Sequence, residues 1–77
     1  MQVADIANYI HIAPGVRSGR PVFIGTRITV GDVLEMLANG MGFEEIVEDF
    51  PKLTREHIQA CLLLAARREK ITLPRAA

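Results

Sequence analysis

Three kinds of side chain in this sequence could take part in catalysis: a single cysteine, two histidines and a run of carboxylates. Cys61 falls on the expected core face of a helix, where a thiol is a buried and inert side chain. His11 falls in an expected strand and His57 in the first turn of an expected helix, and neither is paired with a nucleophile by any recognisable spacing. The carboxylates of "EEIVED" (residues 44–49) recur at spacings of three and four, typical of a solvated helix face. We therefore expect no enzyme activity, no metal site and no cofactor.

Recognition of nucleic acid is a second chemistry open to this chain. The segment "KLTREHIQ" (residues 52–59) places basic and polar side chains on the first turns of a helix, as a DNA-recognition helix requires. Turn residues nearer the N-terminus could add phosphate contacts. The predicted DNA-contacting residues are Lys52, Thr54, Arg55, His57, Gln59, Arg17 and Arg20. Glu56 and the acidic segment 44–49 oppose phosphate binding, so an ordinary solvated helix start is an equally good interpretation.

The charges of the chain are separated along its length. Nine basic and nine acidic residues give a net charge of zero. Residues 1–31 carry a net +2, residues 32–56 a net −5 and residues 57–77 a net +3, counted from three Arg against one Asp, two bases against seven acids, and four bases against one acid. This pattern is not the uniform footprint of a nucleic-acid-binding protein. Each basic end is instead available to an anion or to a partner protein.

The length of 77 residues indicates one small domain with a marginal core. Such domains are usually reinforced by disulfides, a metal or a partner subunit. One cysteine cannot form an internal disulfide, and the Cys and His residues lack zinc-site spacing. We therefore expect a partner chain, with a homodimer as the simplest case. No signal peptide or membrane span is recognisable, which favours a cytoplasmic location.

The elements that must position these residues are a hairpin and three helices. "YIHIA" (residues 9–13) and "PVFI" (21–24) are expected strands joined by the turn residues of "PGVRSGR". Helices are expected after the N-cap Thr29, from Phe43 to Phe50, and after the N-cap Thr54 to about Lys70. The predicted fold is mainly α: a trihelical, helix-turn-helix bundle (29–70) with a short N-terminal β-hairpin (9–28) and a tail (71–77), all in one domain.

The stripes of apolar residues predict how these helices pack. Val30, Val33, Leu34, Leu37 and Ala38 form the stripe of the first helix. The third helix has an expected core face of Ile58, Cys61, Leu62 and Ala65. At about 100° per residue, Leu63 and Leu64 fall outside that face. We favour an interface for them, although Leu64 could instead pack under the hairpin.

The sequence resembles domain-of-unknown-function family 433. The similar segments are "PGVRSGRPVFIGTRITV" and "EEIVEDFPKLTREHIQACLLLAA", and the similarity covers roughly residues 9–66. That family is grouped with homeodomain-like folds and described as VapB-type antitoxins, whose members are often encoded beside a PIN-like toxin. The resemblance implies an antitoxin that binds and neutralises its toxin and represses its own operon as a dimer. Gly42 departs from the serine common before the second helix, which predicts a weaker N-cap there.

Two further expectations concern the residues around the first helix. Gly25 should permit a bulge or a close backbone approach. Arg27 should pair with a carboxylate of segment 44–49, most simply Asp49, rather than contact a ligand. These three residues are predicted to be structural.

The C-terminal third carries the predicted partner surface. Its members are Leu63, Leu64, Arg67, Arg68, Lys70, Ile71 and Leu73. "ACLLLAA" is apolar around most of its helix, and "ITL" has strand character before Pro74. We therefore predict an antitoxin-like function with a cognate toxin as partner and operator DNA as a second ligand. The alternative is a protein–protein adaptor without DNA binding.

Overall fold

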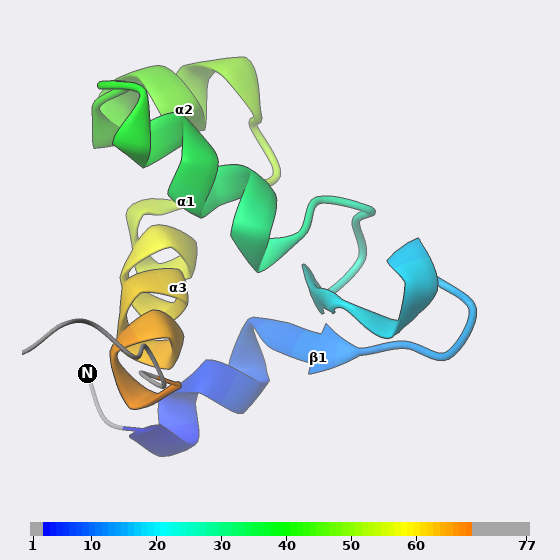
Figure 1. The fold of residues 1–77 in the computed structure, drawn as a ribbon. Coiled ribbons are helices and arrows are strands. Elements are labelled where there is room, and N and C mark those ends of the chain that lie inside the picture. Colours follow the sequence, from blue (N-terminus) through cyan, green and yellow to red (C-terminus); the bar gives the residue numbers. More distant parts are fainter. Residues whose placement is uncertain (1–2, 69–77) are drawn as a thin grey trace, which may run out of the picture.

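The computed structural model describes residues 3–68 of the chain; residues 1–2 and 69–77 lie outside the description. The elements in chain order are the 3₁₀ helix η1 (Val3–Asn8), strand β1 (Ile10–Ile12), the 3₁₀ segment η2 (Arg17–Gly19), strand β2 (Pro21–Phe23) and helices α1 (Val30–Ala38), α2 (Phe43–Asp49) and α3 (Arg55–Arg67). Figure 1 shows α1 and α2 together at one end, α3 next to them, and η1 and the hairpin along the remaining side. The predicted fold class, three helices with an N-terminal hairpin, is confirmed. The predicted tail 71–77 lies outside the described residues, and α3 ends at Arg67, with Arg68 as its C-cap, rather than at about Lys70.

The two strands form an antiparallel hairpin in which Ile10 stands opposite Phe23 and Ile12 opposite Pro21. Pro21 occupies the first position of β2, where a strand tolerates a residue that cannot donate a hydrogen bond. The turn between the strands is unusual, because four of its residues have positive φ: Gly15 (78°), Arg17 (48°), Ser18 (59°) and Gly19 (75°). For Arg17 and Ser18, which carry a Cβ, this left-handed conformation costs free energy that other contacts must offset.

Gly25 belongs to the turn that follows β2. The Thr26 N–H donates to the Phe23 carbonyl at 3.0 Å, and Gly25, third of the four residues, has φ +80°. Positive φ at that position is typical of a type II turn and favours glycine. A Cβ added at Gly25 would meet nothing within 4 Å. The expected close backbone approach is therefore absent, and the glycine is explained by backbone conformation.

The helix starts follow the predicted capping chemistry. At α1 the Asp32 N–H donates to Thr29 Oγ1 at 2.9 Å, and the Thr29 N–H donates to Asp32 Oδ2 at 3.0 Å. This reciprocal capping box satisfies two backbone donors at once. At α2 the N-cap is Gly42, which has no side chain to accept a bond, but its own N–H donates to Glu45 Oε1 at 3.3 Å. The predicted weaker cap therefore retains half of a capping box.

The core lies where β2, α1, α2 and α3 meet. Its fully buried large side chains are Phe23, Ile46, Leu53, Ile58, Val22, Val33 and Cys61. The α1 stripe is confirmed at Val30 and Val33, which are buried, whereas Ala38 is exposed. Leu34 and Leu37 of the stripe pack against the core, and Ala38 is the last residue of α1.

The predicted core face of α3 is partly wrong. Ile58 and Cys61 are fully buried as expected, but Leu62 is 40% exposed and Ala60 is fully buried. The unpredicted helix η1 packs against α3. The buried face of α3 therefore extends toward Ala60, to the side opposite Leu62, so the inward face is turned by roughly 80° from the predicted one. Leu64 is drawn inward by the same rotation and packs against the core.

Candidate functional site

The first turn of α3 holds His57, a predicted DNA contact, in internal interactions. Its Nδ1 accepts a hydrogen bond from the Thr54 N–H at 3.0 Å, so His57 completes the capping box of α3. Its ring meets those of Tyr9 and Phe23 edge-on, with centroid distances of 4.8 and 5.8 Å. Desolvation by this packing lowers the pKa of His57 from its usual value. Thr54 and His57 are therefore occupied in joining α3 to the hairpin.

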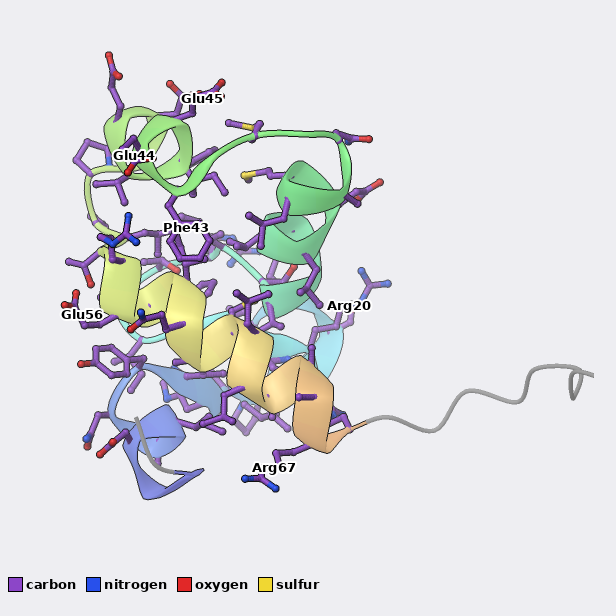
Figure 2. All side chains as sticks on the ribbon, turned by 90° about the vertical axis from the view of Figure 1, so that its left-hand side faces the viewer. Arg20, Phe43, Glu44, Glu45, Glu56 and Arg67 are labelled. Atoms are coloured by element: carbon purple, nitrogen blue, oxygen red, sulfur yellow. The ribbon has the colours of Figure 1, made fainter. Side chains whose placement is uncertain are left out.

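Arg55, another predicted DNA-contacting residue, also makes internal contacts. Its Nη1 lies 3.1 Å from Glu44 Oε1, and its guanidinium stands 4.9 Å from the centroid of the Phe43 ring. Figure 2 shows Phe43 and Glu44 on α2 at the start of α3, with Glu56 nearby. The pKa of Glu56 is lowered by its own backbone N–H and by the Thr54 hydroxyl, so this carboxylate is charged at neutral pH. Negative charge thus surrounds the start of α3.

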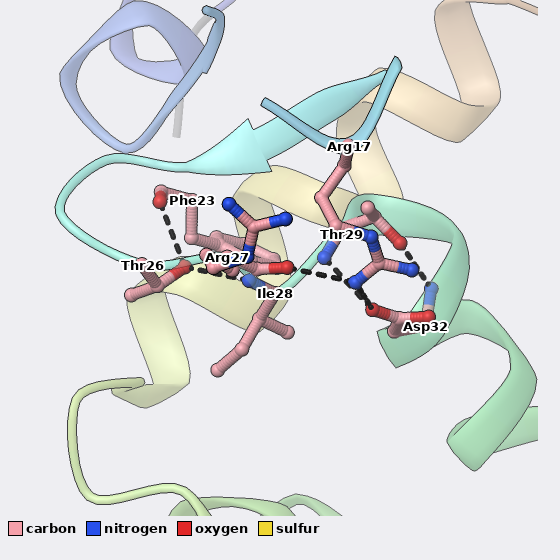
Figure 3. Close-up of polar contacts among 7 residues, drawn as sticks. All are labelled: Arg17, Phe23, Thr26, Arg27, Ile28, Thr29 and Asp32. Atoms are coloured by element: carbon pink, nitrogen blue, oxygen red, sulfur yellow. Dashed lines mark hydrogen bonds and ion pairs between the residues drawn. The ribbon is translucent and has the colours of Figure 1, made fainter. Parts of the chain in front are cut away.

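Arg17 fixes the hairpin turn to the start of α1. Its Nη1 donates both to Asp32 Oδ2 at 3.1 Å and to the Arg27 carbonyl oxygen at 2.9 Å (Figure 3). The pKa of Asp32 is lowered, first by the Thr29 backbone N–H and further by the Thr29 hydroxyl and Arg17. These contacts of the guanidinium offset the free-energy cost of the left-handed backbone conformation at Arg17. Arg17 thus has a structural role here, and its phosphate contact stays a prediction.

The predicted ion pair between Arg27 and Asp49 is absent. Within residues 3–68 the described ion pairs are Arg17–Asp32 and Arg55–Glu44, and both Arg27 and Asp49 are exposed. Ile28 packs toward the core. Because neighbouring side chains of an extended segment point to opposite sides, the side chain of Arg27 turns outward. Arg27 contributes to the structure through its carbonyl oxygen instead.

Cys61 is buried in the core, as the sequence predicts. The thiol is fully buried and donates to the Val30 carbonyl oxygen at 3.6 Å. Burial raises its pKa to about 11, so almost no thiolate exists at neutral pH. The contact ties α3 to the first residue of α1.

A groove lies between the first turns of α1 and the last turns of α3. Its volume is about 620 Å³, and Arg20 and Pro21, at the start of β2, are among its lining residues. Its apolar lining is Pro21, Val30, Leu34, Leu64 and Ala65, and its polar lining is Arg20, Thr29, Gly31, Asp32, Glu35 and Arg68. Figure 2 shows Arg20 on the side where the start of α1 and the end of α3 lie. We call this the Arg20–Arg68 groove.

A second, smaller hollow adjoins the groove. It encloses about 210 Å³ and shares Pro21, Leu64 and Arg68 with the groove. The rest of its lining is Ile6, Ile10, His11 and Ile12. Ile12 is 60% exposed, which makes it the most exposed large apolar side chain of the described residues. We call this hollow the Ile12 hollow.

The structure divides both predicted surfaces. Among the predicted DNA-contacting residues, Arg55 is the first residue of α3. Arg20 lies in the groove with Arg68, which directly follows the last residue of α3. About 20 Å of helix therefore separates Arg55 from Arg20. Among the partner residues, Leu64 and Arg68 line the groove, whereas Leu63 and Arg67 do not. Lys70, Ile71 and Leu73 lie outside the described residues.

Arg20 and Arg68 come from the two basic segments of the chain, which fold onto one groove. The separation of charge along the sequence was therefore a signal for this site. Ile12, Pro21 and Leu34 were not predicted as site residues. Their sequence pattern shows only that they are apolar, and their exposure depends on how η1 and the hairpin pack on α3.

Comparisons with known proteins agree with this architecture. The family model described as "Protein of unknown function (DUF433)" matches residues 10–65. The crystal structure of a DUF433 member protein from Anabaena variabilis is similar, with a TM-score of 0.76 and 29% sequence identity. The similarity covers 86% of this chain and 65% of that one, so the chain spans somewhat less than two thirds of its relative. A comparison with curated proteins finds no match. No helix within residues 3–68 is long and apolar enough to cross a membrane.

Proposed function

The chain belongs to the DUF433 family, and we propose that it is a protein-binding, antitoxin-like factor that binds and neutralises a cognate PIN-like toxin. The observation that carries this proposal is the Arg20–Arg68 groove, whose apolar lining is open to solvent between two basic side chains. An apolar groove with a charged rim suits a protein segment, which can fill it with apolar side chains and pair with its rim. The toxin as partner class is supported by the resemblance of the sequence to antitoxins.

The contacts at the start of α3 favour a protein over operator DNA as ligand. Thr54 and His57 are capping residues, and Arg55 pairs with Glu44. Carboxylates at Glu44, Glu45 and Glu56 would face the phosphates of any duplex that approached Arg55. Of the predicted DNA contacts on this helix, Gln59 alone is an exposed polar side chain outside these pairs. One amide is a small base-reading surface compared with the three or four side chains of a usual recognition helix.

Neutralisation of toxicity is the test that separates an antitoxin from an adaptor. The product of the gene beside this chain's own, expected to be a PIN-like toxin, should arrest growth when expressed alone, and co-expression of this chain should restore growth. Purified together, the two proteins should co-elute. Co-elution without loss of toxicity would favour the adaptor. Persistent growth arrest together with separate elution would contradict the proposal.

A further inference from the structure

We propose that the Arg20–Arg68 groove, extended by the Ile12 hollow, binds an acidic amphipathic segment of the partner protein. This inference rests on the proposed function and specifies where the partner docks and what chemistry it presents. The segment is expected to place apolar side chains on either side of Leu64 and carboxylates against Arg20 and Arg68. The site combines β2, α1, α3 and the hairpin rather than one helix face.

The shape of the surface requires two apolar anchors. The groove and the Ile12 hollow share Pro21, Leu64 and Arg68, so they are adjacent. Leu64, which lines both hollows, is partly buried and packs against the core, so its position between them is fixed. Ile12 stands largely exposed in the second one. A partner that covers Ile12 removes apolar surface from water at no cost to the fold of this chain.

The charge of the rim requires carboxylates on the partner. Arg20 and Arg68 are exposed, and within residues 3–68 neither forms an ion pair. Asp32 on the groove wall is already paired with Arg17. Glu35, also on the wall, is exposed and would repel a uniformly charged polyanion such as nucleic acid. A partner segment that carries a few carboxylates among apolar and neutral residues can pair with Arg20 and Arg68 and keep its negative charge away from Glu35.

A second copy of this chain is the main competing occupant. The helix α2 presents Glu44, Glu45 and Glu48 on its exposed face. Docking of α2 from one copy into the groove of another would be head-to-tail, so it would generate open chains of molecules unless the rotation closed a ring. The partner protein is the simpler occupant, and self-association is an outcome that the experiment distinguishes.

The experiment measures binding of the full chain to the purified product of the gene beside its own, expected to be a PIN-like protein, by surface plasmon resonance at several salt concentrations. The test variants are the double substitution Arg20→Gln/Arg68→Gln and the single substitution Ile12→Thr. The matched controls are Arg27→Gln, which removes an exposed arginine side chain outside both hollows, and Ile24→Thr, which trims another exposed isoleucine. All five substituted positions are exposed, so the melting temperatures of the variants should match that of the wild type, and sedimentation velocity reports the oligomeric state of each variant.

We expect the double variant to bind at least about tenfold more weakly, with slower association and a flatter salt dependence. We expect Ile12→Thr to bind about tenfold more weakly, mainly through faster dissociation. Both controls should stay within about twofold of the wild type. Binding of the wild type with undiminished binding of both test variants would overturn the inference and leave the proposed function standing. No binding by the wild type would overturn both, and a wild-type oligomer dispersed by the double variant would assign the groove to a second copy.

Discussion

Arg17 and Asp32, fifteen residues apart, are joined by an ion pair of 3.1 Å that connects a left-handed turn to the first turn of α1. The same Arg17 nitrogen donates to the Arg27 carbonyl oxygen at 2.9 Å. Because φ of Arg17 is +48°, the backbone there is strained, and the guanidinium contacts stabilise a conformation that the sequence disfavours locally. Asp32 takes part in both this pair and the α1 capping box.

Substitution of Arg17 and Asp32 should therefore be coupled. Arg17→Ala is expected to lower the free energy of unfolding by about 1 kcal/mol, since both side chains of the pair are about a third exposed and solvent weakens their attraction. Asp32→Ala should cost about 1–2 kcal/mol because it also removes the capping box. In a double-mutant cycle by urea denaturation, the double variant should lose about 0.5–1 kcal/mol less than the sum. Strict additivity would show that the ion pair contributes nothing.

The stability of the protein should fall in mildly acidic solution because of His57. Burial holds the pKa of His57 below the value of about 6.5 for the unfolded chain, so the unfolded state binds the proton more readily. The contribution of neutral His57 is then complete above pH 6.5 and is lost as pH falls through the lower folded pKa. Protonation would also prevent Nδ1 from accepting the Thr54 N–H.

The variant His57→Gln tests this assignment. A glutamine at the third helical position can still cap Thr54 but does not titrate, so the decline in stability below pH 6.5 should become shallower. Its stability at pH 7.5 should be lower than that of the wild type, because the ring contacts with Tyr9 and Phe23 are lost. His11→Gln, at an exposed position of β1, is the matched control and should keep the wild-type slope. Thermal melts from pH 5 to 8 make the measurement.

Cys61 should resist alkylation until the protein unfolds. Its pKa of about 11 leaves on the order of 0.1% thiolate at pH 8, and the side chain is fully buried. Iodoacetamide should leave the native chain unmodified over an hour and react fully in guanidinium chloride, as read by mass spectrometry. The variant Ile24→Cys adds an exposed thiol and should gain one modification in the native state. Rapid native labelling of Cys61 would indicate that α3 opens from the core.

The parts of the fold that follow from local chemistry could be predicted from the sequence. Thr29 with Asp32 and Thr54 with His57 mark helix starts through side-chain to backbone hydrogen bonds, and these depend only on residues three apart. Gly15 and Gly19, in the turn between the strands, likewise act over short range. Each such signal is correct in the structure because no distant element competes with it.

The errors arise where distant segments meet. The rotation of α3 depends on η1, whose sequence has no clear helical period, so Leu62 was placed in the core and Ala60 outside it. The sequence predicts that Arg27 pairs with a carboxylate of segment 44–49. In the structure, the ion pair of this region instead joins Arg17 to the capping residue Asp32. The sequence indicates two separate basic ends but not the groove, because the presence of Arg20 and Arg68 at one groove depends on how the hairpin and helices pack.

Free protein should not retard the DNA upstream of its gene at physiological salt. The start of α3 is surrounded by Glu44 and Glu56, and Arg55 would have to exchange its carboxylate and the Phe43 ring for a base edge. Non-specific affinity needs several simultaneous phosphate contacts, whereas the exposed basic groups are spread over both ends of α3. An electrophoretic shift assay at 150 mM and at 50 mM salt makes the test.

Two variants give that assay its controls. Glu44→Gln removes the carboxylate that pairs with Arg55. This variant should still not retard DNA, because the exposed basic residues are spread too widely along α3 to contact phosphates together. Gln59→Ala removes the exposed amide in the middle of the helix. A wild-type shift that weakens with salt and loses about 1–3 kcal/mol of binding free energy on Gln59→Ala would show that α3 reads DNA directly. That outcome would restore operator binding as a function of this surface and would leave the groove as a separate site on the same helix.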